Sequence, residues 1–257
     1  MSRSHLIEPV ARLCRDSPST TVLKLARYFS AMPSSSHVGD TSPSTAAVLF
    51  DLDGTLIDSI ELILRSMRHA FAARGARVPS DAEWLAGVGT PLPAMFAQFA
   101  DGEAQVADLI ASYREFQLAH HDLLVRGYDA LEETLMVLRE KGHPLGVVTS
   151  KSDWLARKGL EHVGVAHLFD TIVGCDSCTR HKPHPEPVLI ALDRLGCAAS
   201  RAVFVGDSVH DIEAGNAAGV VTVAALWGPF TREQLEPARP HRYVERLRDL
   251  PGVLQAL

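Results

Sequence analysis

From residue 46 onward, short runs of consecutive apolar residues alternate with longer segments in which apolar residues recur every three or four positions. Short continuous apolar runs are typical of strands buried on both faces, and the longer period is typical of helices that pack against a sheet. Their alternation predicts an α/β fold with a doubly wound, Rossmann-like parallel sheet. We expect the strands at residues 46–50, 144–150, 170–174, 201–207 and 219–226, and core helices at 128–142, 153–164, 185–196 and 211–219.

The first two expected strands are separated by about 90 residues, far more than one crossover helix requires. An insertion at this point would cover the carboxyl end of the first strand, where open α/β sheets bind ligands. Helical patterns occur within it at residues 59–75, 80–89, 92–100 and 103–125. We therefore expect an all-helical cap at residues 59–127, a core formed by 46–58 and 128–257, and an N-terminal extension at 1–45.

The first 45 residues differ in composition from the rest of the chain. They are rich in Ser and Thr, end in a turn-prone tract and lack the apolar segment of a secretory signal. Basic residues outnumber acidic ones, as in a transit peptide, but Glu8 and Asp16 argue against that interpretation. We expect a flexible or loosely helical extension, with Met32 as an alternative start of translation.

Composition and net charge argue against several classes of function. The formal charge is -6 and the chain has no basic stripe, which argues against nucleic-acid binding. No apolar run approaches the roughly 18 residues needed to span a bilayer, so no membrane partner is expected. The four cysteines do not form the disulfide framework of a small secreted protein, which favours a cytoplasmic location. A monomer and a homodimer are both compatible with the sequence.

Polar residues suited to phosphate chemistry follow four of the expected strands. Because the carboxyl ends of parallel strands share one edge of the sheet, these residues can converge. Carboxylates suit a hard cation such as Mg2+, which would offset the repulsion between Asp51 and Asp53. A lysine and a hydroxyl suit phosphate oxygens, and Gly54 lets the backbone approach a bound phosphate. The sequence therefore predicts a phosphoryl-transfer site. Its candidate side chains are Asp51, Asp53, Thr149, Lys182, Asp207 and Asp211.

The segments FDLDGTLIDS, VVTSK, HKPHPEP and VGDSVHD resemble the four motifs of the haloacid dehalogenase-like (HAD) hydrolase superfamily, in the same order and strand context. The resemblance implies that Asp51 is a nucleophile that becomes phosphorylated. It also implies that Asp53 protonates the leaving group, activates water and contacts the metal through its backbone carbonyl. Mg2+ is the implied cofactor, with Asp207 and Asp211 completing its site. The residues implied to bind the phosphorylated substrate are Gly54, Thr149, Ser150 and Lys182.

A narrower resemblance concerns the insertion and the C-terminal region. SYREFQLAHHD (112–122) and WGPFTREQLEPARP (227–240) are similar to the phosphoglycolate phosphatase branch, including its pyrophosphatase members. The likeness implies a small phosphorylated substrate, either pyrophosphate or a phosphoglycolate-type ester. Arg114 would then bind a second anionic group, although a solvated helix face is an equally good interpretation. Asp53 favours a phosphohydrolase over the dehalogenases of the superfamily, which lack an acid there.

Two other functions stay open. A sugar-phosphate phosphotransferase or mutase of the same superfamily would need a cap group that protects an aspartyl-phosphate from water. A non-catalytic, phosphate-binding regulatory protein would not need the full set of reactive side chains. The intact Asp51, Asp53, Lys182 and Asp207 weigh against the second alternative.

Some of these positions also have a purely structural interpretation. Asp58 is expected to cap the first helix of the insertion, and Asp211 could be only an N-cap. The turn at residues 89–91 either reaches the active site or merely joins two helices.

Cysteines and histidines raise a further alternative. The C-x-x-C and two histidines within residues 175–184 have ligands suited to zinc, but this stretch runs through the lysine motif, which favours reduced loop cysteines. His120 and His121 are adjacent, so they point to different faces of a helix and at most one of them faces the substrate.

Overall fold

The computed structural model describes residues 45–72 and 77–256. The extension expected at residues 1–45 therefore lies outside the described residues, apart from Thr45. Among the described helices, none is both long enough and apolar enough to cross a lipid bilayer.

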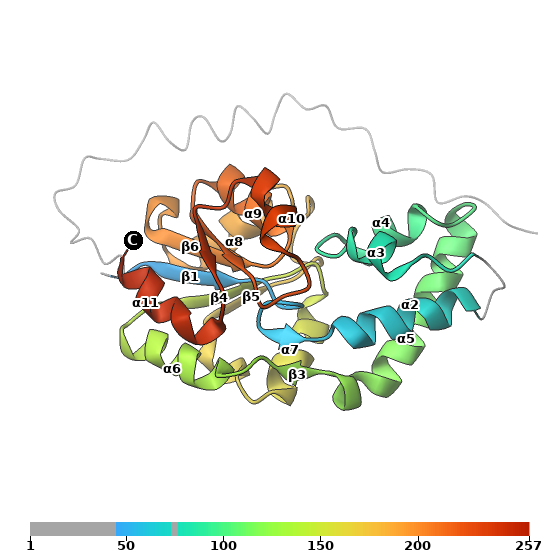
Figure 1. Ribbon diagram of the computed structural model, residues 1–257, viewed down its shortest axis with the longest axis horizontal. Coiled ribbons are helices and arrows are strands. Elements are labelled where there is room, and N and C mark those ends of the chain that lie inside the picture. Colours follow the sequence, from blue (N-terminus) through green and yellow to red (C-terminus); the bar gives the residue numbers. More distant parts are fainter. Residues whose placement is uncertain (1–44, 73–76, 257) are drawn as a thin grey trace, which may run out of the picture. The chain divides into compact units, whose positions relative to one another are not determined.

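In the part of the chain that the structure describes, six strands form a parallel sheet at the centre of the core, in the order β5-β4-β1-β6-β7-β8 (Figure 1). The chain adds β4 and β5 on one side of β1 and then returns to add β6, β7 and β8 on the other. This order confirms the doubly wound, Rossmann-like fold, and it puts the reversal point, where such sheets bind ligands, at β1. The strands are β1 Ala47–Phe50, β4 Leu145–Val148, β5 Thr171–Val173, β6 Ala202–Gly206, β7 Val221–Ala225 and β8 Arg242–Val244.

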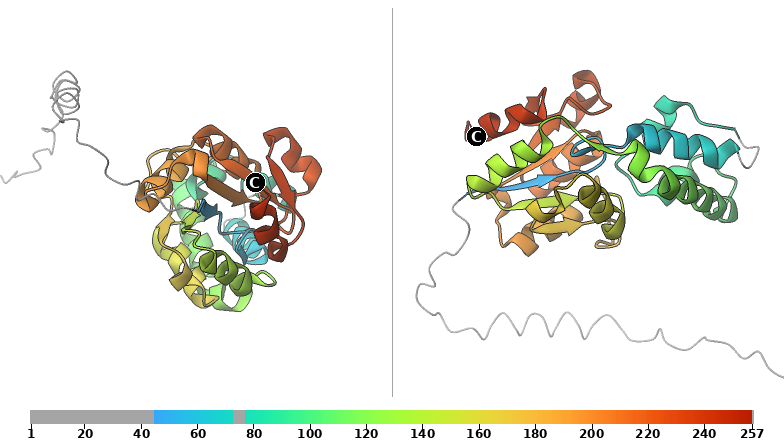
Figure 2. Two further views of the ribbon diagram at one scale, coloured as in Figure 1. Left: turned by 90° about the vertical axis from the view of Figure 1, so that its left-hand side faces the viewer. Right: turned by 90° about the horizontal axis from the view of Figure 1, so that it is seen from below.

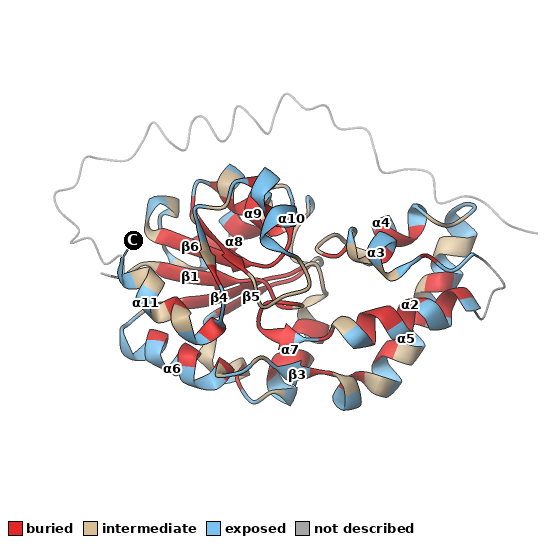
Figure 3. Ribbon diagram, viewed as in Figure 1, coloured by how far each residue is buried: buried red, intermediate tan, exposed pale blue. Residues whose placement is uncertain are grey.

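Helices cover both faces of the sheet, because successive residues of a strand point to opposite sides. In β1, Val48 and Phe50 belong to one buried cluster, with α6, α7 and α11, whereas Ala47 and Leu49 belong to another, with α8 and α9. The innermost strands are consequently buried along their whole length (Figure 3). The core helices are α6 Leu131–Glu140, α7 Asp153–His162, α8 Glu186–Leu195, α9 Val209–Ala218, α10 Arg232–Leu235 and α11 Leu250–Gln255.

Between β1 and β4, the described residues form four helices, which make up the all-helical cap that the long insertion predicts (Figures 1 and 2). The cap has an apolar core of its own, in which the rings of Phe71, Trp84 and Phe96 are in mutual contact. Two short strands, β2 and β3, pair antiparallel where the chain enters and leaves the cap, so the two connections lie side by side. These elements are β2 Ile57–Asp58, α2 Ile60–Ala72, α3 Asp81–Leu85, α4 Leu92–Ala97, α5 Glu103–Leu124 and β3 Arg126–Gly127.

Candidate active site

The carboxyl edge of the sheet gathers the candidate side chains. Asp51 follows β1 directly, Thr149 follows β4 and Asp207 follows β6, while Lys182 comes from the loop before α8 and Asp211 from the first turn of α9. All five side chains belong to buried residues, none more than 5% exposed. Their convergence follows from the parallel order of the strands, as the sequence predicts.

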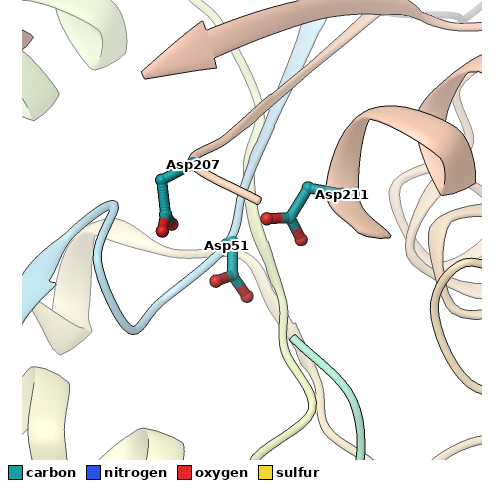
Figure 4. A group of neighbouring side chains, drawn as sticks. All are labelled: Asp51, Asp207 and Asp211. Carbon is teal, nitrogen blue, oxygen red and sulfur yellow. The ribbon is translucent and has the colours of Figure 1, made fainter. Parts of the chain in front are cut away.

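Three carboxylates form a buried acidic cluster (Figure 4). Asp51, Asp207 and Asp211 each contribute one oxygen, and the three oxygens lie within 4.8 Å of one another. The ammonium of Lys182 donates to Oδ1 of Asp51 and to Oδ1 of Asp211, each at 2.6 Å. Since one ammonium faces three carboxylates, the fully ionised cluster has an excess of two negative charges.

Burial, together with this excess charge, shifts the pKa values of Asp51 and Asp207. Burial raises the pKa of Asp51 to about 7; repulsion from Asp211 adds to the effect and Lys182 opposes it. Burial also raises the pKa of Asp207 well above its ordinary value, with repulsion from the other two carboxylates as the next cause. For Lys182, burial disfavours the ammonium, but attraction to Asp211 and Asp51 outweighs it and the pKa is raised. The cluster therefore favours uptake of additional positive charge.

Asp207 identifies where that charge can bind. Its Oδ1 accepts a hydrogen bond from the Thr55 hydroxyl at 2.6 Å, but its Oδ2 is buried without a hydrogen-bond partner among the described residues. A Cβ placed on Gly54 would lie 2.8 Å from Cγ of Asp207, and one on Gly228 would lie 3.1 Å from it, so two glycines make room for this carboxylate. An unpartnered buried oxygen, three converging carboxylates and an excess of two negative charges fit a divalent metal ion with oxygen ligands.

Asp211 has a structural role in addition to its place in the cluster. Ser208 is the N-cap of α9, and its side chain accepts from the backbone N–H of Asp211 while Asp211 accepts from the backbone N–H of Ser208. Asp211 is thus the third helical residue of a capping box and not the N-cap itself. The capping box fixes one carboxylate oxygen, while the other accepts from Lys182.

Asp53 lies apart from the acidic cluster. Its Oδ1 accepts hydrogen bonds from the Ser59 hydroxyl and from Nζ of Lys151, the latter at 2.6 Å. The expected metal contact through its backbone carbonyl would leave this arrangement undisturbed. Lys151 lies within the VVTSK segment and was not predicted as a site residue; its position two residues after Thr149, at the same sheet edge, is the signal that could have identified it.

A cavity of about 80 Å³ separates the sheet edge from the cap. The core lines it with Asp51, Asp53 and the segment 149–151, and the cap lines it with residues of α5 and of the turn before α4. Asp51, the predicted nucleophile, and Asp53, the predicted acid and base, therefore both face a space accessible to a small ligand.

The turn at residues 89–91 reaches the site, which decides between its two interpretations. Ser150 donates its hydroxyl hydrogen bond to the carbonyl of Gly89. Gly89 has a φ of +99°, and a Cβ there would lie 2.8 Å from Oγ of Ser208. One turn of the cap therefore touches the loops that follow β4 and β6. The hydroxyl of Ser150, a predicted substrate ligand, is used in this contact.

Helix α5 contributes polar side chains to the cavity. Arg114 lines it and is half-buried, and Tyr113 and Gln117 line it as buried residues. Burial raises the pKa of the Tyr113 phenol, with repulsion from Asp53 as the next cause, so this group remains protonated. Gln117 was not predicted; it lies three residues after Arg114, a spacing that puts both on one face of a helix.

The other side chains that the sequence singled out as alternatives lie outside the acidic cluster. Among residues 45–72 and 77–256, the acidic cluster is the one group of three or more metal-ligand side chains close enough to share an ion. No cysteine or histidine of the segment 175–184 belongs to it. His120 stacks on Phe116, and the buried His121 contacts Asp122 and the His162 ring, so neither histidine lines the cavity. Asp58 accepts from the N–H of Ile60 at 3.4 Å, at the start of α2.

A doubly wound sheet with acids and a lysine at its carboxyl edge, covered there by a helical cap, is typical of hydrolases with a Rossmann-like core and a cap domain. The chain belongs to the haloacid dehalogenase-like hydrolases, whose family pattern matches residues 48–225. The family and enzyme class predicted from the four motifs are thereby confirmed.

Known proteins similar to this chain include pyrophosphatases and phosphatases. Pyrophosphatase PpaX of Bacillus velezensis is 38% identical over 211 residues, which cover 82% of this chain and 96% of the relative. The crystal structure of a predicted phosphatase from Clostridium acetobutylicum has a TM-score of 0.74 at 28% identity and covers 83% of this chain and 100% of that one. A predicted phosphoglycolate phosphatase from Haemophilus somnus shares the fold, with a TM-score of 0.74 at 24% identity over 84% of this chain and 99% of that one.

Proposed function

We propose that this hydrolase is a Mg2+-dependent phosphohydrolase that acts on a small phosphorylated metabolite, pyrophosphate or a phosphoglycolate-type ester, through an aspartyl-phosphate. The observation that carries the proposal is the acidic cluster with its single ammonium and the unpartnered Oδ2 of Asp207. Such a cluster can hold a metal ion and a phosphoryl group at the same place.

The first half-reaction is nucleophilic. Lys182 occupies Oδ1 of Asp51, and we assign the attack on phosphorus to Oδ2. The new Asp51 O–P bond forms as the bond from phosphorus to the leaving oxygen breaks, and Asp53 donates a proton to that oxygen. Thr149 and Lys182 bind the oxygens of the transferred phosphoryl group.

The second half-reaction is hydrolytic. Asp53 accepts a proton from a water molecule, whose oxygen attacks phosphorus as the Asp51 O–P bond breaks, and free phosphate leaves. Contact of the cap with the loops at the sheet edge excludes other water during these steps.

The proposed metal site consists of the carboxylates of Asp51, Asp207 and Asp211 and the backbone carbonyl of Asp53. When bound there, Mg2+ would neutralise the excess negative charge of the cluster and of the substrate phosphate. Lys182 positions two of these carboxylates, and the Thr55 hydroxyl positions the third.

The choice of substrate has two supports. The relative that is 38% identical over most of both chains is a pyrophosphatase. In addition, Arg114 and Lys151 place two cationic side chains in the same cavity as Asp51, where a second anionic group of the substrate would lie. Pyrophosphate and phosphoglycolate both carry such a group.

Phosphate release tests the proposal. The full-length protein is assayed with Mg2+ against pyrophosphate, phosphoglycolate and a series of sugar phosphates. We expect turnover of at least one of the first two in preference to all sugar phosphates. Transfer of the phosphoryl group between sugar positions without phosphate release would favour the mutase, and failure to turn over any compound would favour a non-catalytic protein.

Trapping tests the intermediate separately. In Asp53→Asn, loss of the general base slows hydrolysis of the phosphorylated enzyme, by about 100-fold or more. With 4-nitrophenyl phosphate, whose leaving group needs no protonation, we expect one equivalent of phosphate bound covalently and released by hydroxylamine. Absence of a covalent adduct in this variant would exclude the aspartyl-phosphate route.

A further inference from the structure

One face of helix α5 is buried along its length but changes in character. Residues on this face follow one another at intervals of four, which puts their side chains in one row: Leu109, Tyr113, Gln117 and His121. Leu109 belongs to the apolar core of the cap, whereas Gln117 and His121 are polar. Tyr113 and Gln117 also line the cavity above the sheet edge. The buried row therefore becomes polar where the helix passes the cavity.

The amide of Gln117 has no hydrogen-bond partner among the described residues, although the residue is only 4% exposed. The hydroxyl of Tyr113, a residue 3% exposed, has none there either. Side-chain atoms that are both fully buried and unpartnered include Nε2 of His121, but neither the Gln117 amide nor the Tyr113 hydroxyl. The polar atoms of these two residues thus remain accessible, and both residues line the cavity. A buried polar group without a partner costs stability, so this pair points to a ligand.

The chemistry of this face suits an anion with several oxygens. The amide of Gln117 has two N–H donors, and the Tyr113 hydroxyl has one. Burial raises the pKa of the Tyr113 phenol, so its proton is available for donation. Arg114 lies beside them on α5 and lines the same cavity, where its guanidinium can offset a negative charge. The group transferred to Asp51 lies at the sheet edge, so these cap residues contact the other end of the substrate.

We propose that Gln117 and Tyr113 determine specificity: with Arg114, they form a subsite on the cap for an oxyanion, the phosphoryl or carboxylate group of the substrate that is not transferred. Gln117 and Tyr113 donate uncharged hydrogen bonds to its oxygens, and Arg114 supplies the counter-charge. A substrate without an oxyanion at this place leaves the buried amide and hydroxyl unpaired and is disfavoured for that reason. This inference rests on the proposed function.

Matched substrates test the proposal. Phosphoglycolate is compared with its neutral amide, and pyrophosphate with methyl phosphate, using whichever pair the wild-type protein turns over. We expect Gln117→Met to lower kcat/KM for the member with a second anionic group by about 10- to 100-fold, the range for a hydrogen bond to a charged group. The member without that group should change by less than about 2-fold. Gln117→Glu should cost the first member more than Gln117→Met, because a carboxylate would then face the oxyanion.

Gln105→Met and Gln105→Glu are the controls. Gln105 also lies on α5, where its side chain accepts from the N–H of Asp101, but it does not line the cavity. The same two substitutions there should leave the substrate preference unchanged. Equal losses on both members of a pair in Gln117→Met would assign the amide to the transferred phosphoryl group or to the fold, and unchanged rates would leave it without a role in recognition. Either result overturns the inference.

Stability of the free protein separates recognition from structure. Gln117→Met replaces an unpartnered amide by an apolar side chain of similar size, so the Tm without substrate should stay the same or rise. A fall in Tm of about 4 °C or more would show that the protein itself uses the amide, contrary to the proposal. Tyr113→Phe keeps the ring contacts with Trp84 and Phe96 and removes only the hydroxyl. It should lower kcat/KM for the member with a second anionic group by about 3- to 10-fold.

Binding gives a readout that does not depend on turnover. Titration calorimetry with methylenediphosphonate and methylphosphonate, in the presence of Mg2+, compares wild type with Gln117→Met. We expect the affinity for methylenediphosphonate alone to fall, by about 10-fold or more. If the wild-type protein binds these probes but hydrolyses no phosphate compound, the proposed function is contradicted while the subsite is still tested by binding. If the wild-type protein is an active phosphohydrolase whose preference survives Gln117→Met, this inference alone is contradicted.

Discussion

The sheet edge and the cap line the same cavity, but they are built in opposite ways. The sheet edge supplies ionisable side chains, such as Asp51 and Lys182, which are buried and held by charged partners at hydrogen-bond distance. The cap supplies a backbone turn at Gly89 and a half-buried Arg114, for which no ion pair is found among the described residues. The comparison suggests that the reaction depends on a rigid edge, whereas admission and recognition of the substrate depend on a surface that can separate from it.

Asp51→Asn gives the largest effect expected at the sheet edge. The amide is nearly isosteric but is not a nucleophile, so turnover of every substrate should fall by at least about 1,000-fold. Circular dichroism and stabilisation by Mg2+ should persist, because Asp207 and Asp211 remain. A variant that keeps wild-type rates would show that the proposed nucleophile is wrong.

Lys182→Met removes the one ammonium of the acidic cluster. Breaking a buried ion pair while its partners remain costs about 3–5 kcal/mol, so the free energy of unfolding at pH 8 without metal should fall by this order. The loss should shrink at pH 5, because burial raises the pKa of Asp51 to about 7 and a proton can replace the missing charge.

Urea denaturation at the two pH values measures this effect. Lys158→Met is the matched control, since its pair with Asp122 is exposed enough to contribute at most about 1 kcal/mol. Equal losses in the two variants would contradict the central position given to Lys182.

The acidic cluster also predicts how metal and pH are linked to stability. Since the pKa of Asp51 rises from 3.8 in the unfolded chain to about 7 in the fold, the metal-free folded state holds a proton that the unfolded state has lost between these values. Stability without metal should therefore decrease as pH rises from about 4 to about 7. Mg2+ at about 100 times its dissociation constant should add about 2.7 kcal/mol at pH 8 and much less at pH 5.

Thermal unfolding with and without Mg2+, at matched ionic strength, checks this linkage. Equal stabilisation by Mg2+ at both pH values would mean that the metal does not bind at the protonatable cluster.

The same contrast explains what could be predicted from sequence. The sheet and its edge were predictable because continuous apolar runs identify buried strands, and parallel strands bring residues as distant in sequence as Asp51 and Lys182 to one edge. Strand β8 was missed because its sequence, RYV, has no apolar run and Arg242 is exposed. The partners of Asp53 were missed because no local pattern specifies which of two nearby lysines reaches which carboxylate.

Contacts of the cap were the least predictable. The hydrogen bond from Ser150 to the carbonyl of Gly89 depends on how the core and the cap, each with its own apolar cluster, meet. Neither local sequence contains that information. The sequence left the role of the 89–91 turn open for this reason.

Gly89→Ala tests the cap's share of the comparison with the smallest expected effect. Its added Cβ would meet Oγ of Ser208 at 2.8 Å and Cδ2 of His210 at 3.2 Å, so the turn has to move away from the segment that follows β6. We expect kcat/KM to fall by about 10-fold while the sheet-edge reaction itself, measured as covalent labelling from 4-nitrophenyl phosphate, changes less.

Gly102→Ala is the control: its φ of +107° imposes a similar backbone strain of about 1–3 kcal/mol, but the new Cβ would have no described atom within 4 Å. If both variants lose stability equally and kcat/KM falls only in Gly89→Ala, closure of the cap contributes to turnover through this one turn. If kcat/KM falls equally in both variants, the effect comes from a general loosening of the cap and not from this turn.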